Sequence, residues 1–209
     1  MSAERIPNEE RIIGYYQEKL SESGFTAKGV DWKDEESQEL RFEVINRYID
    51  LDVSPSVLDV GCGAGSYYAY CKSLGKEIAY TGLDIVPEMT EHVKATHPEV
   101  QVYLGPIDDF TEAHDYVIAS GTFNASIGTD MEAWASYVKS SILKMHQLAR
   151  KAVIINLMSP YVDYTYERLY YPDLNELTRF LIDNCGRDWV IDHDYELYEF
   201  TLMIRKSKG

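Results

Sequence analysis

The sequence predicts an α/β fold in which a doubly wound, seven-stranded, mostly parallel sheet has a reversed last strand. Short β-branched runs alternate with helical segments from residue 56 onward, which is typical of parallel βαβ units. Only about seven residues separate the last two runs, too few for a helical crossover, so these runs should form an antiparallel hairpin. A glycine loop directly after the first run indicates a ligand site at the carboxyl edge of the sheet.

The expected elements follow one another in a regular order. The seven strands are expected at residues 57–60, 78–85, 100–103, 116–119, 152–157, 189–192 and 200–204. Helices are expected between them at residues 66–74, 87–96, 131–148 and 174–184, and before them at 9–20 and 35–49. The first two helices have no place in the sheet, so they should cover its open carboxyl edge. The chain therefore divides into an amino-terminal helical lid segment, residues 1–54, and a sheet domain, residues 55–209.

Composition and charge exclude several classes of partner. The 209 residues are 45% apolar and 26% charged, which is globular composition. Acids outnumber bases 35 to 20, which gives a formal net charge of −15. Because such a chain repels phosphate groups at long range, we expect no nucleic-acid partner and no membrane partner. The mean hydropathy is −0.32, and no apolar run approaches the roughly 20 residues of a membrane span.

The cysteines and the first residues bear on location. Cys62, Cys71 and Cys185 are an odd number without the spacing of metal ligands, so neither a disulfide framework nor a metal site is expected. The first residues contain no apolar stretch of the signal-peptide type. Together these features predict a cytoplasmic protein, and they leave its oligomeric state open.

The most informative segment is the end of the first strand. Asp59 and Val60 lead directly into a loop that contains Gly61, Gly63 and Gly65. Glycine allows positive φ and removes side chains that would keep a ligand away from the backbone. The spacing also fits a dinucleotide-binding loop, but a carboxylate at Asp59 would repel a pyrophosphate and attract an ammonium or sulfonium group.

Residues 59–65, Asp-Val-Gly-Cys-Gly-Ala-Gly, resemble motif I of the class I S-adenosylmethionine-dependent methyltransferases, and the resemblance covers about residues 55–205. It implies a Rossmann-like domain that binds S-adenosylmethionine and releases S-adenosylhomocysteine. The cofactor contacts that it implies are Asp59, Gly61, Gly63, Gly65, Asp84, Ile85, Ile107, Asp108 and Ser120.

Four of these contacts have alternatives, and for Asp59 the alternative is a structural cap on the loop's own amide groups. Asp84 ends the second strand, where an acid can accept both ribose hydroxyls of an adenosine, but this geometry also fits NAD, and an acid at a helix start is the other alternative. Ile107 and Asp108 follow the third strand, where Pro106 occupies the position at which the family often has an acid. Asp108 can equally belong to an ordinary turn.

The sequence contains no compact pairing of a general base with an orienting group. The candidates are His193 and Asp194, which end the sixth strand, and Asn124, which follows the fourth. His114 starts the fourth strand, at the edge of the sheet opposite the ligand site, and is expected at the surface. The same lack of a base is compatible with a non-catalytic cofactor-binding subunit.

Two segments outside the cofactor loops are expected to bind the acceptor. The loop after the fifth strand is rich in tyrosine, and its candidates are Tyr161, Tyr164, Tyr166 and Arg168. In the lid segment the candidates are Trp32 and Arg41, with Tyr15, Tyr16 and Gln38 nearby. The alternative for both segments is that the aromatic rings only pack against the domain.

The function predicted from these features is transfer of a methyl group from S-adenosylmethionine to oxygen or nitrogen of a small-molecule acceptor, such as a sugar or a metabolite. The alternatives are a non-catalytic S-adenosylmethionine-binding subunit and an NAD-dependent oxidoreductase on a similar fold. The Asn-Pro-Pro-Tyr signature of base methylation is absent, in agreement with the charge.

Overall fold

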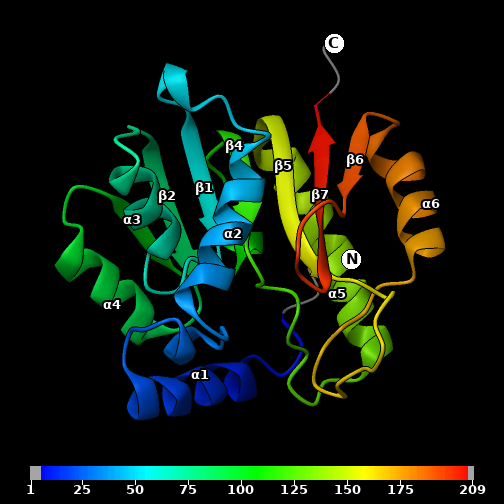
Figure 1. Ribbon diagram of the computed structural model, residues 1–209, viewed down its shortest axis with the longest axis horizontal. Coiled ribbons are helices and arrows are strands. Elements are labelled where there is room, and N and C mark those ends of the chain that lie inside the picture. The colour runs from blue at the N-terminus through cyan, green and yellow to red at the C-terminus, as the bar shows by residue number, and fades with distance from the viewer. Residues whose placement is uncertain (1–5, 207–209) are drawn as a thin grey trace.

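The computed structural model describes residues 6–206, and its one seven-stranded sheet has the order β3-β2-β1-β4-β5-β7-β6 (Figure 1). The strands are β1 (Ser56–Val60), β2 (Ala79–Asp84), β3 (Gln101–Leu104), β4 (His114–Ala119), β5 (Ala149–Met158), β6 (Trp189–Asp192) and β7 (Glu199–Arg205). Strand β7 pairs antiparallel with both β5 and β6, and all the other pairs are parallel. The predicted sheet with a reversed last strand is confirmed.

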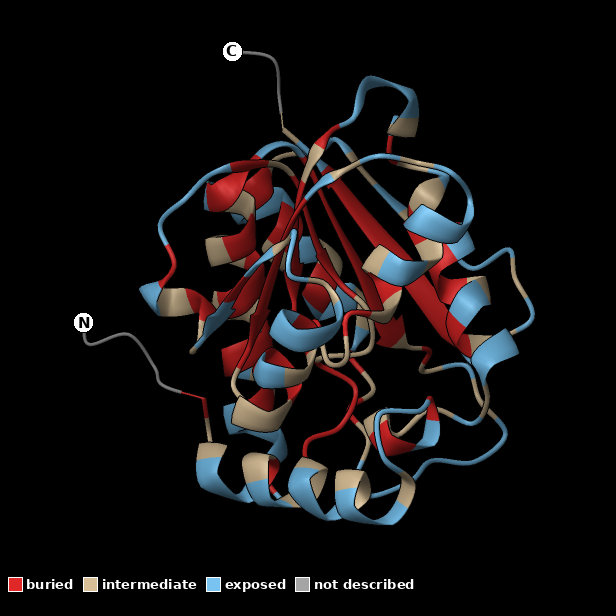
Figure 2. Ribbon diagram, turned by 90° about the vertical axis from the view of Figure 1, so that its left-hand side faces the viewer, coloured by how far each residue is buried: buried red, intermediate tan, exposed pale blue. Residues whose placement is uncertain are grey.

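Helices cover both faces of the sheet. They are α1 (Glu9–Ser23), α2 (Glu35–Asn46), α3 (Ser66–Ser73), α4 (Pro87–Thr96), α5 (Met131–Leu148) and α6 (Leu174–Cys185), with short 3-10 turns η1 (Lys28–Val30), η2 (Leu51–Val53) and η3 (Ile107–Asp109). Because side chains alternate along a strand, Val57 belongs to the buried cluster that includes residues of α2 and α3, whereas Leu58 belongs to the cluster that includes residues of α5 and α6. The buried residues form two clusters, one on each face of the sheet (Figure 2).

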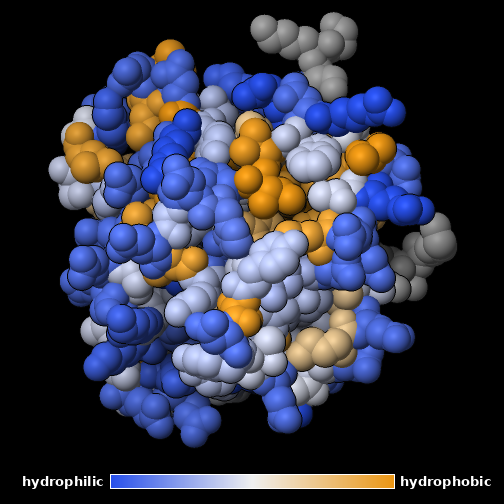
Figure 3. Space-filling view, turned by 45° about the vertical axis from the view of Figure 1, so that its right-hand side comes forward, coloured by the Kyte–Doolittle hydropathy of each residue, from blue (hydrophilic) through white to orange (hydrophobic). Residues whose placement is uncertain are grey.

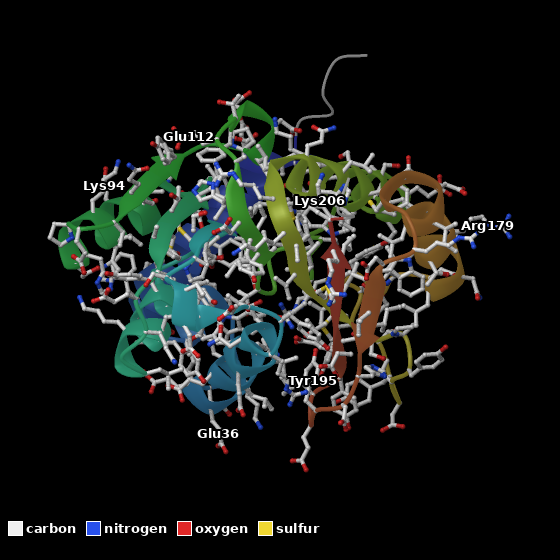
Figure 4. The ribbon with its side chains drawn as sticks, turned by 90° about the horizontal axis from the view of Figure 1, so that it is seen from above. Glu36, Lys94, Glu112, Arg179, Tyr195 and Lys206 are labelled. Carbon is white, nitrogen blue, oxygen red and sulfur yellow. The ribbon has the colours of Figure 1, made fainter. Side chains whose placement is uncertain are left out.

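Helix α1 belongs to neither layer and lies across the lower end of the molecule in Figure 1, beneath the carboxyl ends of β1 and β2. Charged side chains lie at the periphery, where Glu36 on α2, Lys94 on α4 and Arg179 on α6 are exposed and point outward (Figure 4). The surface is mostly hydrophilic, with an apolar area near the centre of the view in Figure 3. No helix within residues 6–206 is both long and apolar enough to cross a membrane.

Candidate functional site

One pocket lies where four parallel strands end. Its floor consists of residues that end or follow β1, β2, β3 and β4, and the amino-terminal segment and α5 complete its walls. The lining includes Asp59, Gly61, Cys62, Gly63, Asp84, Ile85, Ile107, Ser120, Gly121, Thr122, Tyr137, Tyr16, Trp32 and Gln38. Seven of the nine expected cofactor contacts are among its lining residues, and Gly65 and Asp108 are the two that are not.

The glycine loop has the backbone conformation that its sequence predicts. Gly61, Gly63 and Gly65 have φ values of 70°, 52° and 79°, in the region that favours glycine. At Gly61 a Cβ atom would lie 2.4 Å from Oγ1 of Thr122, whose hydroxyl donates to the Val60 carbonyl. At Gly63 the nearest atom to such a Cβ would be Cγ1 of Val30 at 3.4 Å, which is ordinary van der Waals contact, so the positive φ alone favours glycine there. Gly65 instead ends the loop as the cap of α3.

Asp84 holds the glycine loop to the start of α4. Its Oδ2 accepts a hydrogen bond from the Gly63 N–H at 2.8 Å, and its Oδ1 accepts one from the Val86 N–H at 2.9 Å. Only 8% of the residue is exposed, and this burial raises the pKa of the carboxyl group. Each carboxylate oxygen has a second lone pair, so Asp84 can still accept hydrogen bonds from a ligand in the pocket.

Asp59 is 3% exposed, and its carboxylate has one hydrogen-bond partner in the described chain. The Tyr80 hydroxyl donates to its Oδ2 at 2.8 Å. The pKa of Asp59 is raised to about 7, because burial and the charge of Asp84 raise it by more than the Tyr80 hydrogen bond lowers it. Sequence reasoning missed Tyr80. The register of β1 against β2 could have indicated this contact. Asp59 lies opposite Gly82, which has no side chain to separate Asp59 from Tyr80 two positions earlier.

Of the cofactor contacts expected after β3 and β4, Ile107 and Ser120 line the pocket and Asp108 does not. Ile107 lines the pocket, whereas the Asp108 carbonyl accepts a hydrogen bond from Lys144 on α5. Ser120 lines the pocket and donates to Oδ1 of Asn156 at 3.3 Å, and Asn156 in turn donates to Thr201 at 2.7 Å. The tips of β4, β5 and β7 are therefore joined by a polar network beneath the pocket.

Trp32 covers the tip of β4. A Cβ atom on Gly121, which has a φ of 75°, would lie 2.0 Å from Cη2 of the Trp32 indole, so only glycine fits there. The guanidinium of Arg41 lies 4.1 Å from the centre of a Trp32 ring. Arg41 does not line the pocket; it is buried and bonded to Glu199 at the start of β7, with Nε 2.7 Å from Oε2. Sequence reasoning missed Glu199, because no local pattern marks a partner 158 residues away.

The tyrosine loop after β5 lies outside the pocket lining. Tyr161, Tyr164 and Tyr166 are 73%, 64% and 52% exposed. Arg168 donates to Oδ2 of Asp31 at 2.6 Å, which fastens this loop to the amino-terminal segment. The Tyr15 hydroxyl donates to the same oxygen, and Lys19 lies 3.5 Å from the other carboxylate oxygen.

None of the three proton-transfer candidates lines the pocket. His193 lies beside Tyr161 and Phe200, and Asp194 is exposed. Asn124 is buried, and its carboxamide has no hydrogen-bond partner among the described residues. The expectation that His114 lies at the surface is wrong: it is buried, with Nε2 2.9 Å from the Thr81 hydroxyl, because the short β3–β4 connection packs over it.

Comparisons with known proteins agree with this geometry. A family model described as a methyltransferase domain matches residues 57–142. A Mycobacterium tuberculosis protein provisionally named a methyltransferase is 30% identical over 161 residues, which covers 73% of this chain and 93% of that protein.

Solved structures of methyltransferases share the fold. The Burkholderia thailandensis 1,6-didemethyltoxoflavin N1-methyltransferase, solved with S-adenosylhomocysteine, aligns with a TM-score of 0.63 at 19% identity over 97% of this chain and 91% of that chain. An amino pentose methyltransferase from Micromonospora echinaspora, solved with S-adenosylmethionine, aligns with a TM-score of 0.63 at 12% identity over 81% and 91%. The Synechocystis magnesium protoporphyrin IX methyltransferase aligns with a TM-score of 0.60 at 17% identity over 82% and 80%.

Proposed function

The chain belongs to the methyltransferase family, and from this premise we propose that it binds S-adenosylmethionine in the pocket and transfers the methyl group to oxygen or nitrogen of a small-molecule acceptor. The observation that carries the proposal is the convergence of the glycine loop, Asp59 and Asp84 in one pocket. A dinucleotide is disfavoured, because its pyrophosphate would meet these acids and no Lys, Arg or His among the described lining residues.

The residues of the pocket fit this methyl donor. Asp84 has lone pairs for the ribose hydroxyls, and Ile85 and Ile107 offer apolar surface to the adenine. Gly61 and Gly63 line the pocket without side chains, and the methionine part is proposed to lie against them. When bound, S-adenosylmethionine supplies a methyl group already activated by a positively charged sulfur. Gly65 and Asp108 support the loops rather than touching the ligand in this proposal.

The chain's own contribution is alignment and exclusion of water. Trp32 and Tyr16 cover the pocket from the amino-terminal segment, so we propose that residues 1–54 form a lid on the domain of residues 55–209. Among the described lining residues no histidine or lysine can accept the acceptor's proton. His193, Asp194 and Asn124 would need a rearrangement to reach the methyl group, so the proposal assigns them no catalytic step.

The acceptor is proposed to enter between the lid and the loop after β5. Trp32 and the exposed Tyr161, Tyr164 and Tyr166 are the proposed acceptor contacts. Arg41 and Arg168 already have the carboxylates of Glu199 and Asp31 as partners, so we assign them to holding these segments in place. The names of two fold neighbours, an amino pentose and an N1 methyltransferase, support a small-molecule acceptor. The net charge of −15 supports the absence of nucleic-acid and membrane partners, and three free cysteines support a cytoplasmic enzyme.

Titration calorimetry with S-adenosylmethionine tests the cofactor assignment. Loss of the ribose contacts in Asp84→Ala should cost about 2–3 kcal/mol, which is a factor of roughly 30 to 150 in Kd. Glu36→Ala, which removes an exposed acid on α2, is the matched control and should bind like the wild type. Near-UV circular dichroism checks that the variants are folded. Binding by Asp84→Ala within threefold of the wild type would contradict the assignment.

Labelled S-adenosylmethionine and a panel of amines, sugars and hydroxylated metabolites test the acceptor class. We expect label in at least one small molecule, detected by mass spectrometry and lost in Asp84→Ala. Label in bulk RNA or DNA that disappears in Asp84→Ala would contradict a small-molecule acceptor. Binding of the methyl donor without transfer to any acceptor would favour the non-catalytic alternative.

A further inference from the structure

Gln38 is a buried polar side chain of the pocket that the proposed function leaves unassigned. It lies on α2, is 8% exposed and is one of the residues that line the pocket. Its carboxamide has no hydrogen-bond partner among residues 6–206, whereas the Thr122 hydroxyl of the same lining donates to the Val60 carbonyl. Because buried polar groups are normally hydrogen-bonded, the Gln38 amide indicates a partner that comes from outside the chain.

A second buried carboxamide without a partner shows why the position of Gln38 matters. The nitrogen and the oxygen of the Asn124 side chain are both sealed within the protein, and Asn124 does not line the pocket. The side-chain atoms of Gln38 are not among these sealed atoms. Of the two amides, that of Gln38 is therefore the one that a ligand in the pocket can reach.

Neighbouring contacts place Gln38 over the glycine loop and the tip of β4. Residues three and four positions apart share one face of a helix. Arg41, three positions on, packs its guanidinium on Trp32, which covers the tip of β4. Phe42, four positions on, also lines the pocket, and its ring centre lies 5.5 Å from that of Tyr67, in the first turn of the helix that follows the glycine loop. The face of α2 that carries Gln38 is therefore turned toward the loop of Gly61 and Gly63.

We propose that the carboxamide of Gln38 hydrogen-bonds the amino-acid part of the bound methyl donor. This inference rests on the proposed function, in which the methionine part lies against Gly61 and Gly63 and the adenosine lies at the tips of β2 and β3. Gln38 is then a binding residue that the lid segment contributes to the cofactor site. The lid thus takes part in holding the cofactor as well as in covering it.

The chemistry of the amino-acid part suits a primary amide. That part carries an ammonium and a carboxylate, and a carboxamide offers one oxygen acceptor and two N–H donors. Asp59 and Asp84 supply negatively charged acceptors, and the described lining includes no Lys, Arg or His. The carboxylate of the ligand therefore needs neutral donors, and Gln38 has two of them without a partner in the chain.

Titration calorimetry with two ligands tests this contact. S-adenosylhomocysteine carries the amino-acid part, whereas 5′-methylthioadenosine keeps the adenosine and the sulfur but lacks that part. Gln38→Met keeps the length and the helix propensity of the side chain and removes the amide. We expect its Kd for S-adenosylhomocysteine to rise about 5- to 30-fold, and its Kd for methylthioadenosine to stay within about twofold of the wild type. Gln147→Met, which replaces an exposed glutamine on α5, is the matched control and should leave both values unchanged.

Stability without ligand separates a binding role from a structural one. An apolar side chain in place of an unpartnered amide removes no hydrogen bond from the free protein. The urea midpoint of Gln38→Met should therefore equal or exceed that of the wild type. A lower midpoint would show that the amide supports the fold, and would overturn the inference.

A measurement on the wild type does not depend on the variant. The chain contains only four glutamines, so labelling with 15N-glutamine gives few side-chain amide signals in a nuclear magnetic resonance spectrum. The signal of Gln38 should shift when S-adenosylhomocysteine is added and stay in place with methylthioadenosine. An unmoved signal with S-adenosylhomocysteine, or an equal loss of affinity for both ligands in Gln38→Met, would overturn the inference while leaving cofactor binding intact. Binding of neither ligand by the wild type would instead overturn the proposed function.

Discussion

The two halves of the pocket are held together in different ways. At the tips of β1 and β2 the contacts are short hydrogen bonds to uncharged groups, such as Gly63 N–H to Asp84 and the Tyr80 hydroxyl to Asp59, each spanning 21 residues of sequence. At the tips of β4, β5 and β7 an uncharged network from Ser120 to Thr201 is supplemented by ion pairs between distant segments, whose members lie outside the pocket lining. The Arg41–Glu199 pair there spans 158 residues.

In the proposed function, the half of the pocket at the tips of β1 and β2 binds the cofactor, and the half at the tips of β4, β5 and β7 receives the acceptor. The cofactor half is built by neighbouring strands and one loop, so it forms wherever that motif forms. The acceptor half depends on the amino-terminal segment meeting β7 and the loop after β5, so its shape can change without disturbing the glycine loop.

The largest effect is expected from breaking the buried ion pair of the acceptor half. Glu199→Ala leaves the Arg41 guanidinium buried without a counter-charge, and should lower the free energy of unfolding by about 3–5 kcal/mol in urea titrations. The double variant with leucine at both positions should recover most of this loss. A loss below about 1 kcal/mol for Glu199→Ala would mean that the pair does not hold the two segments together.

The cofactor half should respond to pH through Asp59. Its pKa is about 7 in the folded protein, against an ordinary value of 3.8, so the folded protein binds the proton more tightly than the unfolded chain. The stability that this group contributes is complete below pH 3.8 and is lost as the pH rises through 7. We expect Asp59→Asn without ligand to be more stable than the wild type at pH 8, on the order of 2 kcal/mol, and to lose this advantage at low pH. An unchanged difference between the two proteins from pH 5 to pH 8 would contradict the raised pKa.

Trp32 packs against Gly121 at the boundary between the two halves of the pocket. Gly121→Ala places a methyl group where the indole lies and should cost about 1–3 kcal/mol in stability. In a Trp32→Ala background the same change should cost only about 1 kcal/mol, because the positive φ alone then opposes it. Additive costs in this double-mutant cycle would show that the indole does not press on the tip of β4.

The smallest effect on stability is expected at the outer rim of the acceptor half. Tyr164 and Tyr166 are more than half exposed, so replacing both with alanine should change the free energy of unfolding by about 0.5 kcal/mol or less. With an acceptor found by the labelling screen, the same variant should raise KM while the affinity for S-adenosylmethionine stays within twofold. An unchanged KM would remove these two residues from acceptor binding.

Most of the secondary structure was readable from the sequence because each element satisfies a local rule. The glycine spacing required positive φ at Gly61 and Gly63, the β-branched runs matched the strands, and the short last connection required a hairpin. The predicted helix at residues 35–49 was too long, since α2 ends at Asn46 and a turn follows. That boundary depends on how the chain meets β1, which no local pattern encodes.

Local patterns were enough to predict the strands, the glycine loop and the acid at the tip of β2, because these depend on neighbours along the chain and on the geometry of a βαβ unit. The hydrogen bond from Tyr80 to Asp59, the ion pairs of Arg41 with Glu199 and of Arg168 with Asp31, and the burial of His114 became visible only in the folded chain. The partner of a polar side chain depends on which segments pack together, and local patterns do not encode that packing. An arginine that does not pair with an acid near it in the sequence can therefore be paired, in the folded chain, with a carboxylate more than a hundred positions away.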